Sequence, residues 1–148
     1  MMDGTVGTVR AVGTVETVGT DGTNGNGQVG VLLVDDQPAN LVALEAMLQG
    51  LGQRLVTASS GREALKRLLD EDFAVILLDV KMPEMDGYET MRAIREQAAF
   101  RQLPIIAVTA KAMKGDREKC IEAGASDYIA KPVDMDQLLT LLRVWLYR

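Results

Sequence analysis

The sequence contains no histidine, and this absence excludes several kinds of site at once. Without histidine there can be no serine–histidine triad, no histidine-bound metal and no histidine that carries a phosphoryl group. Cys120 is the only cysteine, so no internal disulfide can form. An unpaired cysteine is typical of cytosolic proteins, and we therefore expect a cytoplasmic location. Cys120 falls on a predicted helix and is interpreted as a bystander rather than a nucleophile.

Positive charge and long apolar runs are also scarce. The chain has 16 Lys and Arg against 21 Asp and Glu, which gives a net charge of −5. Because a nucleic-acid-binding surface has to neutralise phosphates, this balance argues against nucleic acid as the main partner. No apolar run approaches the length of a membrane span, and the N-terminus lacks the apolar stretch of a signal peptide. We therefore expect no membrane insertion.

Residues 1–28 have a composition unlike the rest of the chain. They are rich in Gly, Thr and Val and lack large apolar side chains. This composition predicts a flexible low-complexity leader or linker. The alternation of Thr and Val could pair weakly as strand, but the glycine content argues against it. Residues 29–148, in contrast, have the composition of one globular domain.

The predicted domain repeats a strand followed by a helix five times. The apolar runs that indicate strands cover residues 31–34, 54–58, 75–79, 104–108 and 127–130. Helices are predicted to start near Pro38, at capping boxes over residues 60–63, 86–89 and 134–137, and near Ala112, with Gly50, Gly52 and Gly124 as helix ends. This alternation favours an α/β fold, namely an open parallel sheet of five strands in a three-layer arrangement. A (β/α)₈ barrel would need eight such units.

Chemically useful side chains stand where four of the predicted strands end. Asp35 and Asp36 follow the first strand, Asp79 ends the third, Thr109 follows the fourth and Lys131 follows the fifth. Since the carboxyl ends of parallel strands share one edge, we expect these five side chains to converge. Three carboxylates with one lysine favour a divalent cation, and an all-oxygen ligand set suits Mg²⁺. A hydroxyl and an ammonium suit phosphoryl oxygens, and an ionised carboxylate can accept a phosphoryl group.

The motifs that carry these residues occupy positions 34–36, 78–87, 108–110 and 130–132. Together they resemble the receiver domain of bacterial two-component response regulators, from about residue 29 to the C-terminus. Residues 112–120 and 122–128 are similar to receivers attached to hybrid sensor histidine kinases. The resemblance implies a (βα)₅ fold with the flavodoxin-like strand order 2-1-3-4-5.

The resemblance also implies roles for the acidic residues. Asp79 would be the phosphoacceptor. Asp36 and Asp79 would bind Mg²⁺ directly, together with the backbone carbonyl of Lys81. Asp35 would contribute through a metal-bound water.

Further residues would act on the phosphoryl group once it is bound. Lys131 would pair with it, and Thr109 would move to hydrogen-bond it while Tyr128 turns inward. Lys81 and Lys111 occupy positions where the family tunes phosphoryl lifetime, and the sequence leaves the direction of their effect open. The peptide bond before Pro132 would be cis.

The implied partners are proteins. A sensor histidine kinase or a histidine phosphotransfer protein would donate the phosphoryl group, and a downstream protein target would read the face formed by helix four, strand five and helix five. The sequence leaves open a weak homodimer through this face. It also leaves open whether the chain is a stand-alone regulator or a fragment of a hybrid kinase.

The function that these residues favour is a phosphoacceptor whose only reactions are self-catalysed transfer to Asp79 and autodephosphorylation. Three other functions are alternatives to it. A Mg²⁺-dependent aspartyl-phosphate phosphohydrolase would need an acid two residues after the nucleophile, where this chain has Lys81. A nucleotide- or flavin-binding protein would need a glycine-rich phosphate loop that the sequence lacks. A degenerate receiver acting only as a docking module would lack some of the expected site residues, and all of them are present.

Overall fold

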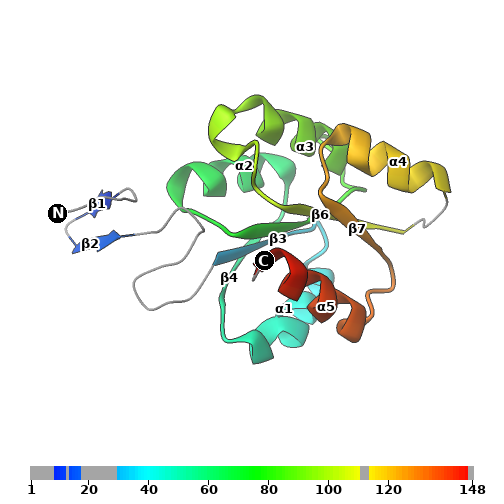
Figure 1. Ribbon diagram of the computed structural model, residues 1–148, viewed down its shortest axis with the longest axis horizontal. Coiled ribbons are helices and arrows are strands. Elements are labelled where there is room, and N and C mark those ends of the chain that lie inside the picture. The colour runs from blue at the N-terminus through cyan, green and yellow to red at the C-terminus, as the bar shows by residue number, and fades with distance from the viewer. Residues whose placement is uncertain (1–8, 13, 18–29, 111–113, 147–148) are drawn as a thin grey trace.

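A five-stranded parallel sheet forms the centre of the computed structural model, which describes residues 9–12, 14–17, 30–110 and 114–146 (Figure 1). The strands lie in the order β4-β3-β5-β6-β7. When only the strands of this sheet are numbered, the order is 2-1-3-4-5, as the resemblance to receiver domains implied. The strands are β3 (Gly30–Val34), β4 (Arg54–Ala58), β5 (Val75–Asp79), β6 (Ile105–Thr109) and β7 (Asp127–Ala130).

Five α-helices cover the two faces of this sheet and complete three layers (Figure 1). One face packs against α1 (Pro38–Leu48) and α5 (Met135–Leu146). The other face packs against α2 (Gly61–Asp70), α3 (Gly87–Glu96) and α4 (Lys114–Ala123). Two short 3₁₀ helices, η1 (Gln49–Leu51) and η2 (Ala98–Phe100), follow α1 and α3. The predicted α/β class and three-layer arrangement are confirmed.

The three central strands are buried along their whole length, which explains their unbroken apolar runs. Side chains such as Leu32, Leu77 and Ile106 have no exposed surface. Each fully buried aliphatic side chain of this kind stabilises the fold by about 1.5–3 kcal/mol. A charge cannot be accommodated inside such a strand, so the carboxylates are confined to its end.

The helix starts follow the predicted capping chemistry with one change. Asp86 and Glu89 form a complete capping box at α3. At α2 the Glu63 N–H donates to Ser60 Oγ over 3.0 Å, but the Glu63 carboxylate accepts from the N–H and hydroxyl of Ser59 instead of the Ser60 N–H. The box predicted there is therefore half formed, because Ser59 offers this carboxylate two donors.

The remaining helix boundaries agree with the sequence wherever the structure describes them. Pro38 opens α1, with Gln37 as its N-cap, and Gly52 ends the following 3₁₀ turn at φ 69°. The Asp134 carboxylate accepts from the N–H of Gln137 at the start of α5. Gly124 follows α4 at φ 122°, whereas the predicted start of α4 near residue 112 lies outside the described residues.

The N-terminal region holds a feature that the sequence argued against. Residues 9–12 and 14–17 form an antiparallel hairpin of β1 (Val9–Val12) and β2 (Thr14–Thr17). The Val and Thr residues of these two segments have high strand propensity, and here it prevails over the glycine content of the region. The division into a leader over residues 1–28 and a domain over residues 29–148 stays a prediction. Among the described residues, no helix is long and apolar enough to cross a membrane.

Candidate functional site

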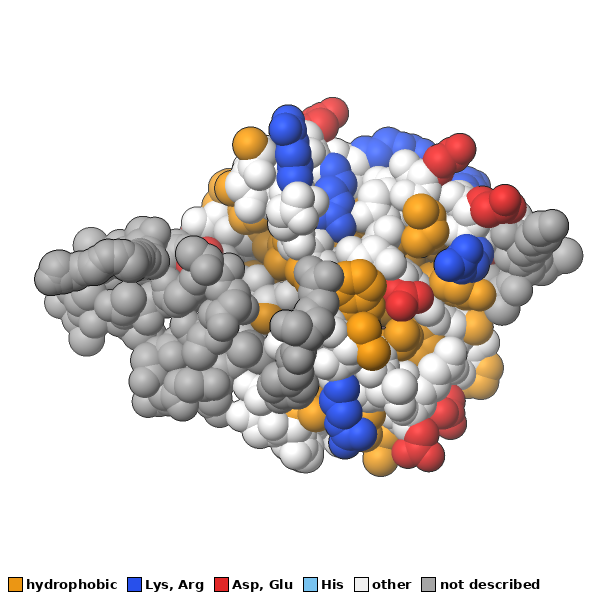
Figure 2. Space-filling view, in the orientation of Figure 1, with side chains coloured by type: hydrophobic (Ala, Val, Ile, Leu, Met, Phe, Trp, Pro, Cys, Tyr) orange, Lys and Arg blue, Asp and Glu red, His pale blue; other side chains and the backbone are white. Residues whose placement is uncertain are grey.

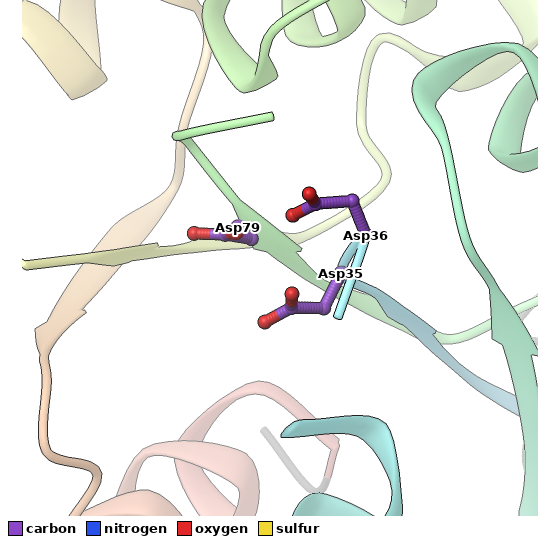
Figure 3. A group of neighbouring side chains, drawn as sticks. All are labelled: Asp35, Asp36 and Asp79. Carbon is purple, nitrogen blue, oxygen red and sulfur yellow. The ribbon is translucent and has the colours of Figure 1, made fainter. Parts of the chain in front are cut away.

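Three carboxylates meet at the carboxyl edge of the sheet because of the strand register. Val34 pairs with Leu78, so Asp35, which follows β3, and Asp79, which ends β5, lie at the same level. Asp36 follows directly, and carboxylate oxygens of all three aspartates lie within 4.8 Å of one another. Figure 3 shows the three carboxylates pointing to the same side. The predicted convergence of the aspartates is therefore found in the structure.

Lys131 is the cation of this cluster. Thr109 pairs with Ala130, which brings the residue after β7 to the same edge of the sheet. The Lys131 ammonium lies 3.1 Å from Asp79 Oδ1 and 3.7 Å from Asp35 Oδ2. One ammonium thus bridges two carboxylates that are 3% and 2% exposed. The peptide bond between Lys131 and Pro132 is cis, as the resemblance to receiver domains implied.

Burial and neighbouring charges act in opposite directions on the ionisation of Asp79. Burial raises its pKa above the usual value, and repulsion from Asp35 acts in the same direction. The hydrogen bond and charge of Lys131 oppose the rise, as does the N–H of Lys81, which donates to Asp79 Oδ1 over 3.3 Å. An anion in this position is therefore costly without further positive charge.

Asp35 is held by two donors at the start of α1, one from its N-cap residue and one from its first turn. Its Oδ1 accepts from the N–H of Gln37 over 2.9 Å, and its Oδ2 accepts from the side-chain amide of Asn40 over 3.1 Å. Asn40 was not predicted as a site residue. The signal available was a polar side chain within the first turn of α1, which alone does not specify a partner.

The loop between β5 and α3 closes tightly around Asp79. The N–H of Gly87 donates to the carbonyl of Val80 over 3.0 Å. A Cβ atom at Gly87 would lie 2.5 Å from the carbonyl oxygen of Asp79, so glycine is required by this approach. Glu84, at the tip of the loop, has φ 61°, a left-handed conformation that is costly for a residue other than glycine. Lys81 lies in the same loop with an exposed side chain.

Thr109 and Tyr128 lie on the two neighbouring strands β6 and β7. Thr109 is 3% exposed, and its carbonyl accepts from the N–H of Lys131 over 2.7 Å. Tyr128 is half-buried against the α2–α3–α4 side, and the guanidinium of Arg117 on α4 lies 6.0 Å from its ring centre. Lys111, the other lysine singled out in the sequence, lies outside the described residues.

The donor set of the cluster fits a hard divalent cation. Three carboxylates and nearby backbone carbonyls offer only oxygen, which is the ligand type preferred by Mg²⁺. A dipositive ion would also offset the charge that Lys131 compensates only in part. The residues present therefore fit the ion that the sequence indicated.

Comparison with known proteins identifies the family. Residues 31–143 match the response regulator receiver domain. The chain belongs to this family. Over 112 residues, 76% of its length, the receiver is 44% identical to the signal transduction histidine-protein kinase BarA of Shigella flexneri. The matched segment is 12% of that kinase, so the chain spans about an eighth of the curated relative.

Two solved structures show the same fold. The receiver domain of the sensor histidine kinase PA1611 from Pseudomonas aeruginosa, solved with magnesium coordinated in its active-site cleft, has a TM-score of 0.74 and 41% identity. That match covers 80% of this chain and 98% of the other. The chemotaxis protein CheY4 of Vibrio cholerae has a TM-score of 0.76 and 33% identity, with coverage of 80% and 99%.

Proposed function

We propose that this receiver accepts a phosphoryl group on Asp79 from a phosphohistidine, in a reaction that requires Mg²⁺. The observation that carries the proposal is the buried Asp79 carboxylate, which lies 3.1 Å from the Lys131 ammonium and close to two further carboxylates. This arrangement leaves an uncompensated negative charge where a cation and a phosphoryl group would be stabilised together.

The transfer is a displacement at phosphorus. A carboxylate oxygen of Asp79 forms a bond to the phosphorus atom while the phosphorus–nitrogen bond of the donor breaks. The bonding electron pair stays on the imidazole nitrogen, which leaves as part of the donor protein. Bound Mg²⁺ would neutralise charge on the phosphoryl oxygens. Its proposed ligands are Asp36, Asp79 and the carbonyl of Lys81, with Asp35 acting through a water.

The remaining residues of the proposal stabilise phosphorylated Asp79 and change the surface of the domain in response to it. Lys131 pairs with a phosphoryl oxygen, which requires it to exchange a carboxylate partner for the new group. The Thr109 hydroxyl donates to another oxygen, and Tyr128 turns inward as Thr109 moves. These contacts bias an existing equilibrium toward an altered α4–β7–α5 surface. The contact of Arg117 with the Tyr128 ring is the part of this surface expected to change first.

The proposed partners follow from the chemistry of the site and from the relatives. The donor is a sensor histidine kinase or a histidine phosphotransfer protein, and the recipient of the signal is a downstream protein. We place the receiver in the cytoplasm and propose residues 1–28 as a leader or linker next to the domain. No catalytic turnover on other molecules is proposed.

Intact-mass spectrometry after incubation with Mg²⁺ and acetyl phosphate tests the proposal. We expect one phosphoryl adduct that disappears in the presence of a chelator and in Asp79→Asn. The matched control is Asp70→Asn, which removes a carboxylate at the end of α2 and should leave the adduct unchanged.

Other outcomes would assign another function. Absence of an adduct on folded protein that also fails to bind Mg²⁺ would contradict the proposal and favour a docking module. Steady release of phosphate at enzyme-like rates would favour the phosphohydrolase.

A further inference from the structure

We propose that Asn40 is a positioning residue for the acidic site, because its side-chain amide sets the orientation of the Asp35 carboxylate. The inference rests on the proposed function, since the bound group is Mg²⁺. It adds to that function a residue on α1 that contacts neither the phosphoryl group nor the ion.

The contacts of Asp35 come from both of its carboxylate oxygens. The N–H of Gln37, the N-cap of α1, donates to Oδ1 over 2.9 Å, and the Asn40 amide in the first turn of α1 donates to Oδ2 over 3.1 Å. From the end of β7, the Lys131 ammonium approaches Oδ2 at 3.7 Å. The Asp35 side chain is 2% exposed, so bulk water is nearly excluded from it. Its orientation is therefore set largely by protein donors.

The terminal torsion of an aspartate side chain is soft, so the plane of its carboxylate has to be fixed by its partners. One donor on each oxygen, from the N-cap and the first turn of α1, is enough to fix that plane. A carboxylate has about four lone-pair positions, and those not used by Gln37 and Asn40 remain for Lys131 and for waters bound to a metal. Without the Asn40 amide, Asp35 would be free to turn toward Lys131 and compete with Asp79 for its ammonium.

The residue type at position 40 is not explained by the helix itself. Near a helix start, an asparagine side chain usually hydrogen-bonds to the backbone of the first turn. Position 40 lies within the first turn of α1, beyond the N-cap at Gln37. The described hydrogen bond of its side chain leads out of the helix to Asp35. The amide thus contributes to the site and not to the helix start.

The test is the affinity of the full chain for Mg²⁺, measured by titration with two-dimensional NMR detection, which follows weak as well as tight binding. Asn40→Ala and Asn40→Leu remove the donor, and the leucine variant retains most of the volume. We expect both to weaken Mg²⁺ binding by about tenfold or more, as is usual when a group that orients a metal ligand is lost. Gln49→Ala, which removes an exposed amide just after α1, should bind Mg²⁺ like the wild type.

A comparison in an Asp35→Asn variant distinguishes an effect of Asn40 on the orientation of Asp35 from a general effect on the structure. In Asp35→Asn the carboxylate that Asn40 orients is gone, so adding Asn40→Ala should cost no further affinity. Thermal unfolding in the presence of a chelator checks that every variant is folded when it is titrated.

Each outcome has one meaning. Wild-type affinity in the two Asn40 variants would overturn the inference while the proposed function stands. The same loss in the Asp35→Asn background would also overturn it, because the amide would then act elsewhere. A wild-type protein that binds no Mg²⁺ would contradict the proposed function itself.

Discussion

At the scale of single residues, the ionised Asp79 carboxylate destabilises the fold that holds it. Burial raises its pKa in the folded protein, so the folded state keeps a proton at this carboxyl that the unfolded chain has already lost. The free energy of unfolding therefore falls as the pH rises from the ordinary carboxyl value through the raised pKa, and the loss persists at neutral pH. An uncharged side chain at this position avoids that cost.

We therefore expect Asp79→Asn to raise the free energy of unfolding in chelator at neutral pH by about 1 kcal/mol, a usual size for one substitution. Lys131 retains Asp35 as its partner in this variant. Urea denaturation measures the change, with Glu118→Gln at an exposed position of α4 as the control. Saturating Mg²⁺ should stabilise the wild type more than the variant, because an ion that binds only the folded state adds to its stability. A less stable Asp79→Asn protein in chelator would contradict this account of the site.

Glu84 offers a second test at this scale, because its φ of 61° is unfavourable for glutamate. Asparagine tolerates the left-handed region, so Glu84→Asn should raise the free energy of unfolding by about 0.5–1 kcal/mol. Glu84→Val, with a β-branched side chain, should lower it by at least about 1 kcal/mol. Equal stability of the two variants in urea denaturation would show that the loop relaxes around this residue.

Tyr88 predicts a dependence of stability on pH in the alkaline range. Burial raises the pKa of Tyr88 to about 12, and the neighbouring Cys120 contributes to the shift. Between pH 10 and 12 the unfolded chain loses the phenolic proton that the folded state keeps, so the free energy of unfolding falls as the pH rises. Tyr88→Phe should show a shallower fall than the wild type in urea denaturation at pH 9 and pH 11. Parallel slopes would refute the assignment.

At the scale of the elements, one side chain joins the ends of two helices. The Arg95 guanidinium, at the end of α3, donates to the carbonyl of Gly124 over 2.9 Å and to that of Phe100 over 2.7 Å. It also donates to the hydroxyl of Ser126 over 3.4 Å, just before β7. Removal of Arg95 would leave several part-buried acceptors without this donor.

We expect Arg95→Leu to lower the free energy of unfolding by about 2–3 kcal/mol, because charged hydrogen bonds and part-buried carbonyls are lost together. Arg92→Leu, on an exposed position of the same helix, should stay within about 0.5 kcal/mol of the wild type. Hydrogen exchange should become faster at the amides of residues 124–126 in the first variant alone. Equal effects of the two substitutions would refute the proposed link between α3 and the end of α4.

The sequence predicted those features that depend on local pattern. Buried strands appear as unbroken apolar runs, and the residues at or just after their ends lie at the carboxyl edge of the sheet. Asp35, Asp79 and Lys131 could therefore be placed together from the sequence alone. Contacts that depend on how a helix sits on the sheet could not be predicted. Asn40 reaches Asp35, and Arg95 reaches Gly124, only because of the angle and distance at which α1 and α3 pack.

Local competition limited the prediction in two other places. The pairing of residues 9–12 with residues 14–17 depends on whether strand propensity or glycine content prevails, and the prediction from sequence that glycine would prevail was wrong. The half-formed capping box at α2 depends on whether Glu63 accepts from Ser60 or from Ser59, two donors one residue apart.

At the scale of the whole molecule, the receiver concentrates its chemistry at one edge of the sheet. Acidic and basic side chains are interspersed over the face that Figure 2 shows, so charge does not single out a second site on that face. A net charge of −5 also disfavours approach to nucleic acid and is compatible with a protein partner. The proposed function therefore depends on one carboxylate, Asp79, and on its neighbours.

The measurement that tests this claim most directly is localisation of the phosphoryl group by borohydride reduction. Borohydride converts an aspartyl phosphate to homoserine, and peptide mass mapping then identifies the position that has changed. After incubation with acetyl phosphate and Mg²⁺, the account predicts homoserine at position 79 and unmodified aspartate at positions 35 and 36. Homoserine at another aspartate, or unreduced Asp79 in protein that carries the phosphoryl adduct, would contradict it.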